Sequence, residues 1–140
     1  MVYYPTFYVM GRTTKDAQGR IIVYQGEVIG AQVAWQNTGA TSYAPKMRLD
    51  LRRTATIPYP MPSWQEGEWV QCAAVAAGGQ GTCVVTSIPV PGDWGPGVTI
   101  DVKIQVLGIE GPSWQEDDIF VVGEEVPVAI ISVTPYVVEG

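Results

Sequence analysis

Apolar and polar residues alternate with a period of two along several segments of this chain. The clearest segment is 98–106, in which five aliphatic residues alternate with polar ones. Successive side chains of a β-strand point to opposite faces, so this segment is predicted to be a strand with one face in a core and one in water. Segments 45–53 and 28–36 follow the same pattern, and no segment has the apolar stripe of a helix.

The alternation also predicts which side chains face the core. We expect buried side chains at Val98, Ile100, Val102, Ile104 and Val106, at Met47, Leu49 and Leu51, and at Ile29, Ala31, Val33 and Trp35. Shorter β-forming runs occupy residues 3–10, 20–24, 69–76, 82–90 and 119–122. Short strands separated by Gly- and Pro-rich turns predict an all-β fold, an antiparallel sandwich of immunoglobulin-like type.

The length of 140 residues fits one domain, 1–140. We expect its core at about 20–122, an N-terminal strand within 1–12 and a C-terminal arm at 123–140. Residues 126–138 are nearly all apolar, so the arm must either extend its own sheet or pair with the edge of another subunit. The terminal residues that we expect at an intersubunit contact are Val128, Ile130, Ile131, Val133 and Tyr136 of the arm, and Tyr4 and Phe7 of the first strand.

Residues 26–122 resemble the CARDB-like group of bacterial immunoglobulin-like domains. The resemblance rests on Gly26-Glu27 opening a strand that ends in Asn37-Thr-Gly39, and on Gly67-Glu68 before a later strand. It continues with the alternating segments 47–51 and 98–106 and with a last strand after Glu116-Asp117-Asp118. The resemblance implies a seven-stranded sandwich that serves as a spacer or an adhesive unit in surface and virion proteins.

Charge and composition exclude several classes of function. The net charge is −6, so the chain gains no counterion-release free energy on nucleic acid, and anionic membrane surfaces are disfavoured. No stretch of 18 apolar residues exists to enter a membrane. The chain has no histidine, and no acid–base pair or nucleophile constellation is visible, so we expect neither a cofactor nor an enzyme. The first residues lack the pattern of a signal peptide.

Cys72 and Cys83 flank the Gly-rich segment 77–81, which we interpret as a hairpin loop. Such a hairpin would set the two cysteines opposite each other, within reach of a disulfide. The alternative is two buried free thiols that behave as small apolar residues. The carboxylate groups at 66–68, 116–118 and 124–125 are interpreted as solvated charges, with a Ca²⁺ site at Asp117 or Asp118 as the alternative.

Five tryptophans are many for 140 residues. Trp64, Trp94 and Trp114 lie in loop-like sequence, where they either contact a partner or a sugar, or fold over the ends of the sandwich. Trp64 and Trp114 belong to a repeat, Pro-Ser-Trp-Gln-Glu, at 62–66 and 112–116. The repeat reflects either similar loop chemistry or two exposed loops that each present a Trp.

The sequence therefore predicts a non-enzymatic structural protein that self-associates through its termini. We expect a virion component (a capsid decoration or tail protein) or a surface-filament subunit, and hence a virion or extracellular location. Its partners would be copies of itself or other structural subunits. The alternative is a carbohydrate-binding or adhesive module that uses the loop tryptophans to bind a glycan.

Overall fold

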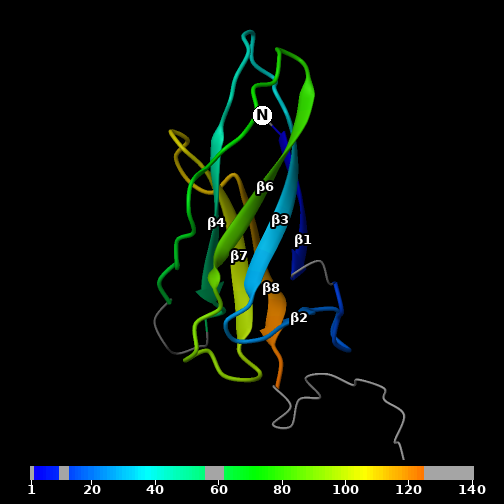
Figure 1. The fold of residues 1–140 in the computed structure, drawn as a ribbon, viewed down its shortest axis with the longest axis vertical. Coiled ribbons are helices and arrows are strands. Elements are labelled where there is room, and N and C mark those ends of the chain that lie inside the picture. The colour runs from blue at the N-terminus through cyan, green and yellow to red at the C-terminus, as the bar shows by residue number, and fades with distance from the viewer. Residues whose placement is uncertain (1, 10–12, 56–61, 125–140) are drawn as a thin grey trace, which may run out of the picture.

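Eight strands form two packed sheets in the part of the chain that the computed structural model describes (Figure 1). The structure describes residues 2–9, 13–55 and 62–124. The first sheet has the order β1-β3-β6, formed by Val2–Val9, Val28–Gln36 and Gln80–Pro89. The second has the order β2-β8-β7-β4-β5, formed by Ile21–Val23, Trp114–Val122, Thr99–Val106, Lys46–Arg53 and Val70–Gln71. The all-β sandwich is therefore confirmed, and in the described ranges no helix capable of crossing a membrane occurs.

The strand pairings are antiparallel except that β2 runs parallel to β8. The first two strands belong to different sheets, so the chain passes from one layer to the other between β1 and β2.

The predicted inward-facing side chains form the core between the sheets. Met47, Leu49 and Leu51 of β4 have no exposed surface, and neither do Ile100, Val102, Ile104 and Val106 of β7. Ile29, Ala31 and Val33 of β3 are equally buried, Trp35 is 2% exposed, and Val98 packs half-buried against them. The period-two pattern therefore placed the core correctly on all three strands.

The interpretation of 77–81 as the loop of a hairpin between strands at 69–76 and 82–90 is wrong. The strand expected at 69–76 is reduced to β5, whose two residues pair with Lys46 and Met47 of β4 and not with β6. The Gly-rich segment 77–81 instead connects the edge of one sheet to the edge of the other. A turn at Ala76–Gly79, with Gly78 at a φ of +77°, makes this connection.

Each end of the sandwich is closed by a buried side chain. Directly after the end of β3, which is at the top of Figure 1, Asn37 ties two loops together, because its amide donates to the carbonyl oxygens of Thr41 and Val75. At the opposite end, where β8 finishes, Trp94 is 5% exposed and packs into the core. Trp94 is therefore a plug of its own domain, and its prediction as an interface residue is wrong.

Candidate interaction surfaces

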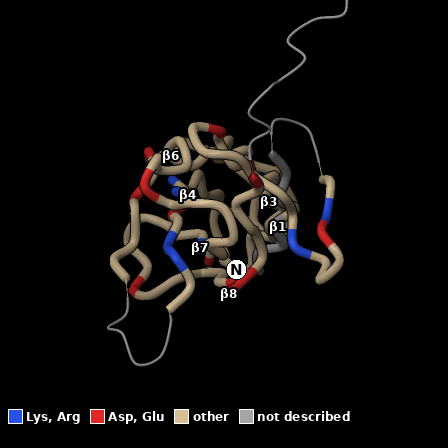
Figure 2. Tube along the Cα trace, turned by 90° about the horizontal axis from the view of Figure 1, so that it is seen from below, with Lys and Arg blue, Asp and Glu red and all other residues tan. Residues whose placement is uncertain are grey.

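The outer face of the five-stranded sheet carries charged side chains that the alternation placed in water. Three of them are buried: Asp50 is 0%, Asp101 1% and Arg52 6% exposed. Figure 2 shows basic and acidic segments close together around β4 and β7. The expectation of a wet face is thus wrong for the middle of this sheet, because residues 62–69 run beside β4 and the side chains of Trp64, Glu66 and Trp69 reach over Arg52 and Arg48.

Residues 62–69, which we call the strap, are held to β4 by backbone and by aromatic contacts. Gln65 bridges to Leu51, and the Gly67 N–H donates to Asp50 Oδ1 at 3.1 Å. The Trp64 ring lies 4.2 Å from the Arg52 guanidinium and 4.6 Å from Lys103 Nζ. These cation–π contacts occupy Trp64 with partners from its own domain.

Two ion-pair groups lie under the strap. In the first, Arg52 Nε and Nη2 both lie 3.0 Å from Asp101 Oδ2, while Asp101 Oδ1 accepts from the Thr54 hydroxyl at 2.6 Å. A buried carboxylate is stable only when its oxygens are paired in this way. Asp101 is therefore fully engaged in holding strands together and is not available as a general base.

The second group centres on Asp50. Arg48 Nη2 donates to Asp50 Oδ2 at 3.0 Å, and Arg48 also pairs with Glu66 of the strap at 2.6 Å. Lys103 Nζ lies 3.8 Å from Asp50, and the Arg48 guanidinium lies 4.6 Å from the Trp69 ring. The strap thus donates directly to Asp50 through Gly67, whereas the donors to Asp101 come from Arg52, Thr54 and the Asp118 amide.

A bulge in β8 places Asp118 in a left-handed conformation, with a φ of 60°. Ile100 pairs with Phe120 and Val102 with Glu116, so three residues of β8 oppose Asp101 alone. The Asp118 N–H donates to Asp101 at 2.9 Å, and its carboxylate accepts from Arg20 at 2.7 and 2.9 Å.

The Arg20 hydrogen bonds lower the pKa of the Asp118 carboxyl, and the same hydrogen bonds raise the pKa of Arg20. Asp117, the other candidate calcium ligand, accepts from Gln115 and lies 3.6 Å from Arg52. Of the carboxylates predicted as solvated charges or as a calcium site, Glu66, Asp117 and Asp118 take part in ion pairs, whereas Glu68, Glu116 and Glu124 are exposed. Within the described ranges, no three His, Cys, Asp or Glu side chains are grouped for a metal ion.

The three-stranded sheet has the opposite character, because β1, β3 and β6 contain no Lys, Arg, Asp or Glu. On β3 and β6 the outward side chains alternate with the buried ones, and Val84 is 52% exposed. We call this surface the uncharged face, defined by Gln32, Ala34, Gln36, Thr82, Val84 and Thr86. The sequence analysis did not predict this surface, although the sequence shows that these strands contain no charged residue.

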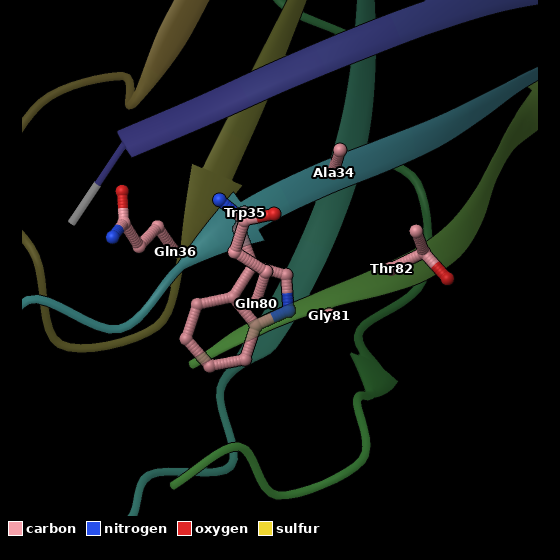
Figure 3. A pocket seen from close by; sticks show the side chains of 6 residues that line it. All are labelled: Ala34, Trp35, Gln36, Gln80, Gly81 and Thr82. Carbon is pink, nitrogen blue, oxygen red and sulfur yellow. The ribbon is translucent and has the colours of Figure 1, made fainter. Parts of the chain in front are cut away.

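A hollow of about 350 Å³ lies beside this face, lined by Ala34, Trp35, Gln36, Gln80, Gly81 and Thr82. The register sets Ala34 opposite Thr82 and Gln36 opposite Gln80. Figure 3 shows the Ala34 side chain pointing away from the indole of Trp35, which turns into the core. The lining combines amides, a hydroxyl and apolar atoms, and it carries no charge.

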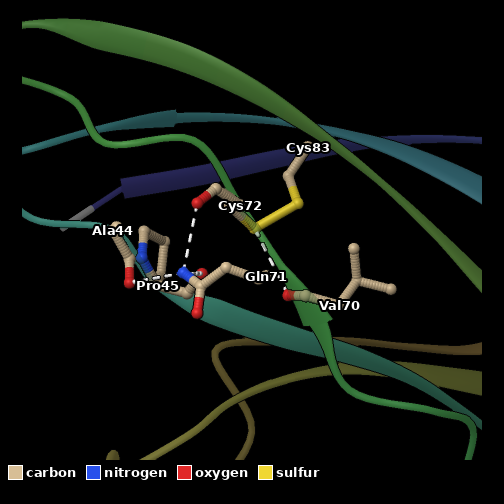
Figure 4. The surroundings of a disulfide bond; sticks show 6 residues. All are labelled: Ala44, Pro45, Val70, Gln71, Cys72 and Cys83. Atoms are coloured by element: carbon tan, nitrogen blue, oxygen red, sulfur yellow. Dashed lines mark hydrogen bonds between the residues drawn. A yellow bond between two sulfur atoms is a disulfide. The ribbon is translucent and has the colours of Figure 1, made fainter.

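Cys72 and Cys83 form a disulfide, with their Cα atoms 5.5 Å apart (Figure 4). Cys72 follows β5, whereas Cys83 lies within β6. The bond therefore joins the edges of the two sheets and does not close a hairpin. Gln71 fixes the same segment by donating to the carbonyl oxygens of Ala44 and Pro45.

The two copies of the Pro-Ser-Trp-Gln-Glu repeat lie on opposite sides of the β4–β7 pair. Gln65 of the first copy bridges to Leu51 of β4, and Gln115 of the second pairs with Lys103 of β7. Trp114 was expected in a loop, but it is the first residue of β8 and packs half-buried against the core. The repeat therefore does not present two equivalent tryptophans.

The remaining interface candidates belong to the terminal segments. Tyr4 and Phe7 lie in β1, where they pair with Ala34 and Ala31. Val128, Ile130, Ile131, Val133 and Tyr136 lie outside the described residues, so their contacts stay a prediction.

The fold and its two contrasting faces define an all-β sandwich domain. No family model and no curated protein matches the sequence. Among solved structures, the chain is similar to a β-glucosidase from Listeria innocua in complex with glucose, with 14% identity and a TM-score of 0.52 over 89% of this chain and 16% of that one. A β-glucosidase involved in saponin metabolism from intestinal bacteria gives 16% identity and a TM-score of 0.53 over 87% of this chain and 16% of that one.

A β-glucosidase from Erythrobacter marinus gives 14% identity and a TM-score of 0.51 over 86% of this chain and 15% of that one. The chain thus spans about a sixth of the length of these enzymes. At such low identity the likeness concerns the fold of one part of each enzyme and carries no activity to this chain.

Proposed function

We propose that this protein is a non-enzymatic structural subunit that assembles through its terminal segments. It would serve in a virion, as a capsid decoration or tail component, or in a surface filament. The observation that carries the proposal is β1, an uncharged strand at the edge of the three-stranded sheet whose strand partner, within the described ranges, is β3. Its second edge offers backbone N–H and C=O groups to a further strand.

Residues 126–138 are suited to bind such an edge. They contain no charged residue and follow β8, which lies against β1. An added strand satisfies its own backbone groups and buries apolar side chains at the same time. The opposite edge of this sheet is less open, because the disulfide at Cys83 holds the chain after β5 beside β6.

The disulfide supports a location outside the reducing cytosol, since such bonds persist in oxidising compartments. This fits a virion or an extracellular assembly. The alternative, a glycan-binding module that uses loop tryptophans, has less support. Trp94 is buried, and the rings of Trp64 and Trp69 have arginines of their own domain stacked on them.

Light scattering after size exclusion tests the proposal on two variants. One lacks residues 124–140, and the other is the full chain with Ile130→Asp, which places a charge in the apolar segment. We expect the unaltered chain to be a multimer, and both variants to form smaller species that still melt cooperatively. A matched control, Glu139→Gln, changes a charge outside 126–138 and should assemble like the unaltered chain.

The proposal is overturned if the full chain is a monomer at all concentrations, or if both variants assemble normally. If both variants simply unfold, the segment completes its own domain and does not donate a strand. A full-length monomer that binds glycans would favour the alternative.

A further inference from the structure

We propose that the uncharged face binds the same face of a second copy of this chain, in a twofold contact. The inference rests on the proposed self-assembly and names the surface that a neighbour would cover. Its starting point is the distribution of charge. The molecule carries a net charge of −6, yet β3 and β6 contain no charged residue at all.

Like-charged copies repel, and the repulsion is weakest where facing surfaces carry no charge. The five-stranded sheet would bring Glu66 and Asp117 of each copy, which are both exposed, toward those of the other. The uncharged face brings only amides, hydroxyls and aliphatic groups together. A second copy therefore meets the lowest electrostatic barrier there, and no ion loses its water on contact.

The chemistry of the face also suits a twofold contact. In such a contact residue i of one copy meets residue j of the other, and j meets i. The amides of Gln32 and Gln36 each carry donors and an acceptor, so they can bind either an amide or a hydroxyl group of the facing copy. The β-branched side chains of Thr82, Val84 and Thr86 add apolar contact between these amides.

The shape of the surface points the same way. Val84 protrudes, with 52% of its surface exposed, and the hollow of about 350 Å³ begins two residues away at Thr82. A knob and a hollow on one face allow Val84 of each copy to enter the hollow of the other. Such mutual insertion is one way in which a surface can be complementary to its own copy across a twofold axis.

Sedimentation velocity of the full chain over a range of concentrations tests the contact. In Val84→Lys the face acquires a cation that would be buried on contact, and we expect its self-association to weaken by about tenfold or more. Val84→Thr keeps the face uncharged and should stay within about threefold of the unaltered chain. Leu107→Lys alters a side chain that is also 50% exposed, but lies after β7, and should have no effect.

The outcomes separate this inference from the proposed function. If Ile130→Asp dissociates the assembly and Val84→Lys does not, the chain assembles through its terminal segment and the uncharged face is not the contact. If the unaltered chain is a monomer, both ideas fail. If Val84→Lys lowers the melting temperature of the monomer without changing the assembled mass, the face is covered by the chain itself, and the inference is wrong.

A fold defect in Val84→Lys would be recognised by a lost cooperative melt. In that case Gln32→Lys on β3, which is also exposed, replaces it. Normal assembly of this second variant would likewise overturn the inference.

Discussion

At Asp101 a single carboxylate joins three parts of the five-stranded sheet. It accepts from Arg52 of β4, from the Thr54 hydroxyl that follows β4, and from the Asp118 amide in the bulge of β8. Transferring a carboxylate out of water is expensive, and these donors offset that expense only when all are present. Arg52 depends on Asp101 in return, since it is only 6% exposed.

Replacing Asp101 by Asn should therefore destabilise the domain strongly. The variant leaves Arg52 buried without its counter-charge, and we expect a loss of about 3 kcal/mol in the free energy of unfolding. Urea unfolding at neutral pH measures it. Glu68→Gln is the matched control on the exposed part of the strap and should stay within about 0.5 kcal/mol of the unaltered protein. A loss in Asp101→Asn as small as that of the control would mean that the ion pair is dispensable.

The contrast between Leu51 and Arg52 shows what the sequence can predict at this scale. Leu51 is buried because its strand alternates, and the alternation is visible in β4 alone. Arg52 points to the other face and is buried only because Trp64 lies over it. That contact joins two segments whose pairing no local pattern reveals, so the candidate site was missed while the core was predicted.

The strap and the chain after it act as one element that closes the side of the sandwich. The strap covers β4, and the disulfide then ties residue 72 to β6 of the other sheet. A Cβ on Gly67 would meet the Leu49 carbonyl oxygen and lie 3.0 Å from that of Thr86, so this glycine allows the chain to pass between the two sheets.

Removal of the disulfide should measure how much this element stabilises the fold. Closing a loop between residues 11 apart contributes about 3 kcal/mol through the entropy of the unfolded chain. We expect the double variant Cys72→Ala/Cys83→Ala to lose about that much in chemical denaturation. The unaltered protein should lose stability when a reductant is added, whereas the variant should not respond. Equal stability of variant and unaltered protein would contradict this account.

Elements with a full alternation were predicted well, and elements without one were not. β3 occupies the predicted 28–36, because nine residues of pattern specify its face and its length. β5 keeps only two residues of the predicted 69–76. Both a hairpin and a connection between the two sheets would bring Cys72 and Cys83 close together. The spacing of the cysteines in the sequence therefore could not distinguish these two chain paths.

For the whole molecule, the two sheets divide the charge between them. The five-stranded sheet contains the paired acids and bases, and the three-stranded sheet contains none. The sandwich fold could be predicted from the sequence. The separation of charged residues between the two sheets could not, because it depends on which strands share a sheet. The resemblance to CARDB-like domains stays a prediction, as does the role of residues 126–138.

Salt should strengthen the self-association of this acidic protein. Raising the ionic strength from about 0.02 M to about 0.5 M shortens the range of charge repulsion to a few ångströms, which favours contact between copies of net charge −6. We expect the dissociation constant in sedimentation experiments to fall over this range. An assembly held by ion pairs between subunits would instead weaken with salt, and that result would contradict a contact through uncharged surfaces.

The loop at Ala77-Gly78 lies at the opposite end of the sandwich from the end of β8 (Figure 1). Both residues are exposed, and the neighbouring ends of the loop are fixed by Asn37 and Val75. A foreign peptide inserted there would point away from the end at which β8 finishes. If copies assemble as proposed, the same insertion would appear once per subunit across the whole particle, which would make this small protein a carrier for the multivalent display of epitopes.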